Sequence, residues 1–335
     1  MNKSIESLQV IRAIAACSVV LTHIYGASVP VIGSSGIFGV DLFFVLSGYL
    51  MTITYRKNRT GYQFIKSRIL RIYPPYLVLS LPLIIFSYFY KNISASDIFH
   101  NITLLPTIHG NYDRINFVCW TLTYELYFYI VFSLCMYIFK GARNVILSTS
   151  FTMLVLFFLA GGVNGGLAGW KDNSIHHMIG NYLILDFILG SLIGLAYNGY
   201  TYKKNAFPIL LSIAIIITSC TIIGHIHLPE PYNNYQLITF LTSGIPACVV
   251  IYITSKVSVD KIPLKKALIY IGTASYSIYL THLYAVFAFS KLTHNNAPEK
   301  FLCFVTSIVI GCVAYYTIER KIIIKKRTMF DNMSI

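Results

Sequence analysis

The sequence predicts an all-α protein that crosses a membrane about ten times, and three observations lead to this fold class. Apolar residues make up 56% of the 335 residues, whereas charged residues make up only 11%. Soluble domains carry about 25% charged residues, and a soluble interior of this size cannot bury so many apolar side chains. The apolar residues also gather in long runs between short polar connections. A bilayer accepts such runs at ~20 residues for each helical span.

Ten runs are long enough to span a bilayer. Backbone amides cannot stay unpaired in lipid, so the runs are expected to be helices, and they lack the alternation of β-barrel strands. Pro74 and Pro75 are expected to begin the third helix, where proline is tolerated. Because the remaining segments are short, residues 1–335 are predicted to form a single membrane domain without a separate soluble domain. The runs cover residues 10–29, 37–55, 72–90, 118–139, 145–163, 178–197, 206–224, 236–254, 267–288 and 301–318.

Lys and Arg are distributed unevenly over the connections. With the N-terminus placed inside, 21 of the 26 Lys and Arg side chains fall on the inner side, which predicts that both termini are cytoplasmic. The net charge of +14 then reflects topology and contact with lipid headgroups. No nucleic-acid partner is expected, because no basic soluble domain is present. A signal peptide ending near Ser28 is the alternative for the first run.

Two ionisable side chains occupy the first predicted helix. Ionisable groups inside a span are costly and therefore mark functional sites. Arg12 and His23 are eleven residues apart, so they share one helix face and lie ~16 Å apart along the axis. Arg12 is expected near the cytoplasmic end, and His23 in the outer half of the membrane.

Further ionisable side chains are predicted at the depth of His23. Their common depth suggests a shared polar cavity, although depth alone does not establish which helices are neighbours. Each also has a structural interpretation. Asp41 could cap its helix, Glu125 could be an ion-pair partner, and Asp186 and His282 could be buried structural groups. These residues are Asp41, Glu125, Asp186 and His282.

Arg68 and Arg71 add positive charge at the predicted cytoplasmic surface. They are three residues apart and share a face, and with Arg12 they would form a cationic inner entrance. Guanidinium groups bind phosphates well, so a phosphate-bearing substrate is expected there. Their alternative role is as positive-inside anchors. The seven cysteines are scattered without a CxxC pair, and no metal site is expected.

Seven segments form an ordered set of motifs across nearly the whole chain. They are Leu8–Ala16 followed by His23, Gly39–Tyr49, Ser67–Pro74, Trp120–Glu125, Phe187–Ser191, Ile271–His282 and Ile318–Arg320. In this order they resemble the acyltransferase 3 family of integral-membrane O-acyltransferases, with Thr121 at a position where the family often has Ser.

The resemblance implies transfer of an acyl group, commonly acetyl, from acyl-coenzyme A to a hydroxyl of a cell-envelope glycan such as lipopolysaccharide or capsule. It also implies a bacterial inner-membrane location. His23 is the expected catalytic residue and Arg12 its partner, while Arg68 and Arg71 match the basic pair of the family.

The mechanism expected from these residues is general base catalysis. His23 would deprotonate the acceptor hydroxyl, Asp41 or Glu125 would orient its imidazole, and the arginines would hold the donor phosphates. An acyl-histidine intermediate is an open variant. A proton-coupled transporter or exporter is the alternative function, because intramembrane His and carboxyl groups also suit proton relays. A purely structural scaffold would leave the shared face of Arg12 and His23 unexplained.

Overall fold

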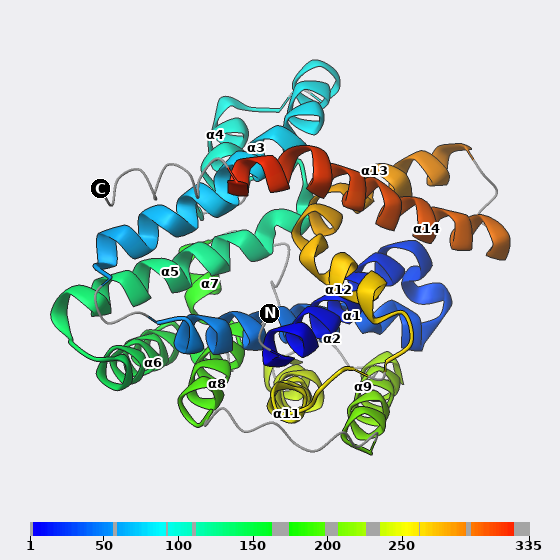
Figure 1. Ribbon diagram of the computed structural model, residues 1–335. Coiled ribbons are helices and arrows are strands. Elements are labelled where there is room, and N and C mark those ends of the chain that lie inside the picture. The colour runs from blue at the N-terminus through cyan, green and yellow to red at the C-terminus, as the bar shows by residue number, and fades with distance from the viewer. Residues whose placement is uncertain are drawn as a thin grey trace.

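The computed structural model describes residues 3–55, 59–91, 93–108, 112–162, 174–197, 207–225, 235–260, 262–292 and 296–324. Within these ranges the regular structure is helical, and the β-type contact is an isolated bridge between Thr107 and Ser174. The all-α fold class is therefore confirmed (Figure 1).

Fourteen α-helices follow one another along the described residues. Short 3-10 segments precede α2 and α5, at Gly26–Ser28 (η1) and Phe117–Cys119 (η2), and π-helical segments occur at Phe240–Gly244 (η4) and Tyr315–Glu319 (η5). The helices are α1 (Lys3–Tyr25), α2 (Pro30–Ile53), α3 (Gly61–Tyr90), α4 (Ala95–Thr103), α5 (Trp120–Ile138), α6 (Ala142–Leu159), α7 (Ile175–Ile179), α8 (Leu183–Leu195), α9 (Phe207–His225), α10 (Tyr235–Thr239), α11 (Ile245–Ser255), α12 (Lys265–Thr273), α13 (Ser275–Leu292) and α14 (Ala297–Ala314).

Nine segments of the described chain are long and apolar enough to span a membrane, and they correspond to nine of the ten predicted runs. The remaining run, 267–288, folds as α12 and α13. The 18 residues of α13 include polar side chains that make it less apolar than the nine, notably Ser275, Ser277, Thr281 and His282. These same polar residues prove to belong to the functional site.

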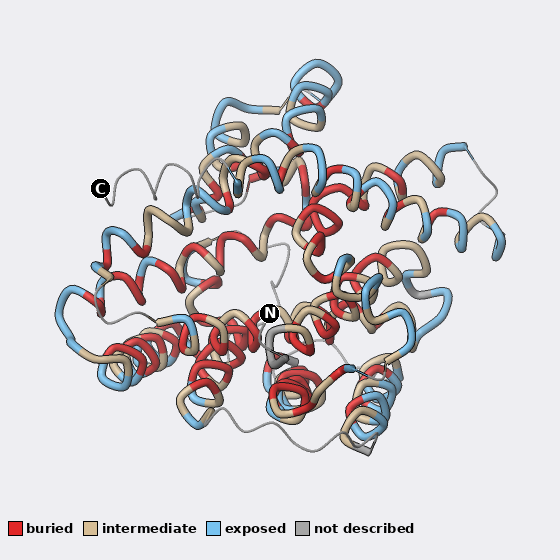
Figure 2. Tube along the Cα trace, viewed as in Figure 1, coloured by how far each residue is buried: buried red, intermediate tan, exposed pale blue. Residues whose placement is uncertain are grey.

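The surface of the bundle is strongly apolar. Large exposed side chains include Phe151 and Phe158 on α6, Leu210 on α9, and Val309 and Val313 on α14. Water would not tolerate so extensive an apolar surface, whereas lipid tails accept it. The chain is therefore a multi-pass membrane protein. Figure 2 shows burial concentrated on α2, α8 and α11, and exposure on the outward side of α9 and along α14.

The bundle is organised around α2, which packs against α1, α8 and α9. Glycines allow the closest of these contacts. A Cβ at Gly190 of α8 would collide with the carbonyl of Val45, and one at Gly48 of α2 would collide with the carbonyl of Phe187. Small residues let helix backbones approach closely in membranes, and Gly48 and Gly190 serve this purpose between α2 and α8.

The start of α3 differs from the sequence prediction. Thr60 caps the helix, and Gln63 closes a capping box, so α3 begins at Gly61. Pro74 and Pro75 therefore lie inside a 30-residue helix and do not begin it. The cap supplies a stronger start signal than proline does, because it satisfies two free backbone amides. As a result, Arg68 and Arg71 belong to the membrane-spanning helix itself.

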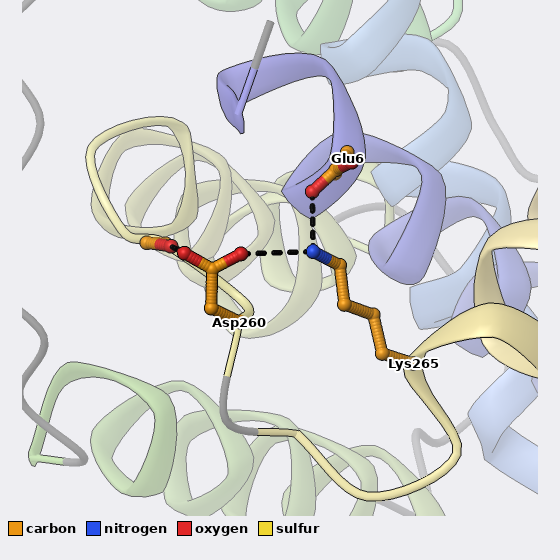
Figure 3. Close-up of polar contacts among 4 residues, drawn as sticks. Glu6, Asp260 and Lys265 are labelled. Carbon is orange, nitrogen blue, oxygen red and sulfur yellow. Dashed lines mark hydrogen bonds and ion pairs between the residues drawn. The ribbon is translucent and has the colours of Figure 1, made fainter. Parts of the chain in front are cut away.

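A polar cluster joins the N-terminal part of α1 to the connection between α11 and α12. Lys265 Nζ lies 2.6 Å from Glu6 Oε2 and 2.9 Å from Asp260 Oδ1 (Figure 3). Hydrogen bonds to Glu6 and then to Asp260 raise the pKa of Lys265 above its usual value. The two contacts tether α12, and with it the start of α13, to α1.

Candidate active site

Three arginines line one cavity between α1, α2, α3, α5 and α13. Arg12 comes from α1, and Arg68 and Arg71 come from α3. Apolar residues of α2, among them Val40 and Phe43, form another part of its wall. The three arginines that were predicted to lie together thus share one cavity, with Arg71 exposed and Arg68 half-buried.

Arg12 is held in place by the first residue of α13. Its Nη2 and Nε donate hydrogen bonds to Ser275 Oγ at 2.9 and 3.2 Å. The guanidinium therefore points toward α13, while its remaining N–H groups stay available for a ligand in the cavity.

Arg68 stacks on two aromatic rings of the cavity wall. Its guanidinium carbon lies 5.1 Å from the centroid of Phe64 and 5.2 Å from that of Tyr129. Tyr129 donates a hydrogen bond to Glu125 Oε1. The planar guanidinium is fixed by stacking, which leaves its edge for a phosphate. Glu125 thus belongs to the arginine cavity and does not contact His23.

His23 pairs with a histidine of α13. Its Nδ1 lies 3.0 Å from His282 Nε2, and the ring of Phe117 packs edge-on at 5.2 Å. The contact brings together two residues predicted at the same depth. Because Ser275 and His282 contact Arg12 and His23 respectively, the predicted common face of Arg12 and His23 is confirmed as the face toward α13.

The hydrogen bonds of the pair determine where its protons lie. His282 Nδ1 is 3.1 Å from the carbonyl of Ile278, which only accepts, so Nδ1 carries the proton. In neutral His282 the Nε2 atom is then an acceptor, and His23 Nδ1 donates to it. The consequence is that His23 Nε2 carries a lone pair and can take a proton from a hydroxyl.

Tyr279 connects the histidine pair to the arginine cavity. Its side chain lines the cavity, and its ring centroid lies 6.1 Å from that of His282. The Tyr279 hydroxyl donates to the carbonyl of Val118 at 2.6 Å and lies 2.8 Å from Thr121 Oγ1. Thr121 and Tyr279 thereby fix the wall between the two parts of the site.

Asp41 and Asp186 occupy a different place. Both are fully buried, on α2 and α8, and Asp41 accepts a hydrogen bond from Tyr182 at 3.1 Å. Their carboxyl groups interact with each other and not with His23. The single polar cavity expected from common depth is therefore wrong: the five residues divide into the histidine pair, Glu125 among the arginines, and this acid pair. Rotation of each helix about its axis decides the neighbours, and depth does not reveal it.

Glu319 is the main residue of the site without a predicted role. It is 4% exposed, lies on η5, and accepts a hydrogen bond from Ser277 Oγ at 2.6 Å. It also interacts electrostatically with Arg71 and Arg12. The only sequence signal was its position in the segment Ile318–Arg320, because the π-helical turn that directs its side chain inward has no obvious pattern.

No group of three His, Cys, Asp or Glu side chains within the described ranges could hold a metal ion. The site thus combines an arginine-lined cavity with a hydrogen-bonded histidine pair.

The sequence was compared with known protein families. Residues 5–317 match the acyltransferase domain of the Acyl_transf_3 family, which covers nearly the whole chain. The chain belongs to this family. It is accordingly a multi-pass membrane O-acyltransferase.

Similar proteins include the exopolysaccharide production protein ExoZ of Rhizobium meliloti, at 28% identity over 87% of this chain and 91% of ExoZ. The O-acetyltransferase OatA of Staphylococcus aureus is 26% identical over 95% of this chain but only 57% of OatA. A probable poly-β-1,6-N-acetyl-D-glucosamine export protein of Staphylococcus aureus is 23% identical over 93% of this chain and 92% of its own length. No solved structure matches the chain.

Proposed function

We propose that this acyltransferase moves an acyl group, most simply acetyl, from acyl-coenzyme A to a hydroxyl of a cell-envelope polysaccharide or glycolipid. The observation that supports the proposal is the contact between His23 and His282, which Tyr279 connects to a cavity lined by three arginines. The names of the related exopolysaccharide and O-acetyltransferase proteins support a glycan acceptor. The proposed location is the bacterial inner membrane, with both termini in the cytoplasm.

The donor would enter from the arginine side. Its phosphates would bind Arg12, Arg68 and Arg71, since guanidinium groups form paired hydrogen bonds with phosphate oxygens. Arg12 and His23 are separated by ~16 Å along α1. A donor held at the arginines therefore needs an extended arm to bring its reactive carbonyl to His23, and acyl-coenzyme A has such an arm.

His23 would then act as the general base. Its Nε2 takes the proton of the acceptor hydroxyl while the oxygen attacks the thioester carbonyl. The new ester forms as the carbon–sulfur bond breaks, and the leaving thiolate recovers the proton from His23. His282 would orient His23 and share the positive charge, which is the part that Asp41 or Glu125 was expected to play.

The related export protein favours a second candidate, export of a glycan through the bundle. The two functions differ in whether a thioester is consumed. Purified protein in lipid nanodiscs, given acetyl-coenzyme A and envelope glycan extracted from cells that lack the gene, should release free thiol. Protein without added glycan is the control. If thiol release with glycan does not exceed that of protein-free nanodiscs, acyl-coenzyme A is not the donor, and glycan uptake into sealed vesicles would support the exporter.

A further inference from the structure

The buried acid pair lies where α2 contacts α8 and takes no part in the mechanism above. Asp41 and Asp186 are each 0% exposed, and their carboxyl groups interact directly. The Tyr182 hydroxyl donates a hydrogen bond to Asp41 Oδ1 at 3.1 Å. Within the described residues this bond serves one of the four carboxyl oxygens, and the Ser243 hydroxyl is the other hydroxyl beside Asp41.

Four buried oxygen atoms at this place lack a hydrogen-bond partner within the described part of the chain. They are Asp41 Oδ2, both carboxyl oxygens of Asp186, and Ser243 Oγ. Ser243 is itself 0% exposed and lies next to Asp41. It belongs to the π-helical segment η4, and π-helical segments often occur at functional sites. The following residue, Gly244, leaves room for Asp186, because a Cβ there would lie 3.3 Å from Asp186 Cγ.

Within the described part of the chain, no positively charged side chain interacts with the pair. The titratable side chains that interact with the pair are Tyr182, just before α8, and Cys248 on α11. Among the described residues of α1, α9, α11 and η4, no Lys, Arg or His interacts with either carboxyl group. Two unpaired negative charges inside a helix bundle would cost far more than the contact between two helices can offset.

Binding of one proton by the pair would remove one of the two negative charges. A protonated carboxyl group donates a hydrogen bond to its partner carboxylate, which satisfies one oxygen on each residue and removes one negative charge. We propose that Asp41 and Asp186 form a binding site for one proton, shared between the two carboxyl groups, on which the α2–α8 contact depends.

The site has a consequence for the arginine cavity. α2 contributes Asp41 to the pair and also Val40, Phe43 and Ser47 to the cavity wall. Loss of the proton would place a second charge in the α2–α8 contact and loosen α2, and with it one wall of the cavity. The proton site holds α2 in place and does not depend on which substrate occupies the cavity.

The experiment is a pH series of the apparent melting temperature of the purified protein in nanodiscs. A proton bound more tightly in the folded state makes stability fall as pH rises, by up to about tenfold in the unfolding equilibrium per pH unit. Asp186→Asn carries a permanent N–H donor in place of the proton, so it should fold and lose this pH dependence. Asp186→Ala, without a donor, should melt lower at every pH. Asp113→Asn, in an exposed position, is the matched control and should follow wild type.

A second measurement keeps the proposal testable if Asp186→Asn does not fold. Infrared spectra of the wild type should contain the carbonyl band of a buried protonated carboxylic acid, and Asp41→Asn should abolish it. Absence of that band, or identical pH slopes in wild type and Asp186→Asn, would overturn the proposal. Restoration of wild-type stability at alkaline pH by sodium chloride, but not by choline chloride, would also overturn it, because the ligand would then be a sodium ion. These readouts do not depend on acyl transfer.

Discussion

At the scale of single residues, the site depends on contacts between side chains of α1 and side chains of α13. Arg12 meets Ser275, and His23 meets His282, at two levels of the same helix contact. The arrangement separates the tasks of the site: the arginines line the cavity, and the histidine pair lies beyond Tyr279 of the cavity wall. Substitutions in the two parts should therefore affect different kinetic constants.

Arg68 and Arg71 are proposed to bind the phosphates of the acyl donor. Replacing both by Ala should raise KM for acyl-coenzyme A by about 10–100-fold while kcat changes little, because contacts to the distant phosphates stabilise the bound substrate and the transition state alike. Initial rates over a series of donor concentrations test this. Arg143→Ala, on an exposed part of α6, is the control, and an unchanged KM in the double variant would leave both arginines as membrane anchors.

Part of this site could be predicted from the sequence, and part could not. The common face of Arg12 and His23 follows from helical periodicity alone. The partners of that face do not, since Ser275, Tyr279 and Glu319 are distant in sequence and ordinary in type. Asp41 was expected to orient His23 because the depth of a residue in the membrane can be estimated from its position in a span. The rotation of α2 about its axis cannot be estimated in this way, since packing at Gly48 and Gly190 turns Asp41 toward α8.

At the level of single elements, α2 and α8 bring their backbones close together at Gly48 and Gly190. Gly190→Leu should lower stability by ~1–3 kcal/mol or prevent insertion, because its side chain would overlap the Val45 carbonyl. Thermal unfolding in nanodiscs measures the effect. Leu192→Ala, on the exposed side of the same helix, should change stability far less. Equal losses in the two variants would show that the backbone approach at Gly190 is not critical.

The short helix α4 offers a separate test outside the membrane-spanning helices. Burial tends to raise the pKa of Asp97, but hydrogen bonds from Ser94 and from the Asp113 backbone outweigh it and lower the pKa. A depressed pKa means that the ionised carboxylate stabilises the folded state above about pH 4 and that this stability is lost as pH falls below that value.

Asp97→Ala should therefore speed amide hydrogen exchange in α4 near neutral pH, because the hydrogen bonds of Asp97 with Ser94 in the capping box are lost. The difference from wild type should shrink in acid. A difference that persists unchanged below the pKa would contradict the capping role.

Capping also explains why the predicted start of α3 was wrong. The capping box of Thr60 determines where the helix begins, and Pro74 does not.

At the scale of the whole molecule, composition predicted the membrane bundle, but the boundaries of the polar helix α13 required the packed structure. Orientation remains a prediction from the Lys and Arg distribution. Reporter fusions after Ile335 should report a cytoplasmic position, and fusions within residues 226–234 an external one. An external C-terminus would reverse the proposed direction of donor entry, since the arginines would then face away from the cytoplasmic pool of acyl-coenzyme A.

The proposed role of His23 Nε2 is to activate the acceptor for acyl transfer, and a single substitution tests this role. Wild-type protein and His23→Gln, at matched amounts in nanodiscs, receive isotopically labelled acetyl-coenzyme A and envelope glycan, and mass spectrometry measures label on the glycan. Gln keeps hydrogen bonding but cannot take up a proton, so the rate should fall by ~10²–10⁴-fold while melting temperature and KM for the donor stay close to wild type. Labelling of the glycan by His23→Gln at the wild-type rate would show that His23 is not the general base.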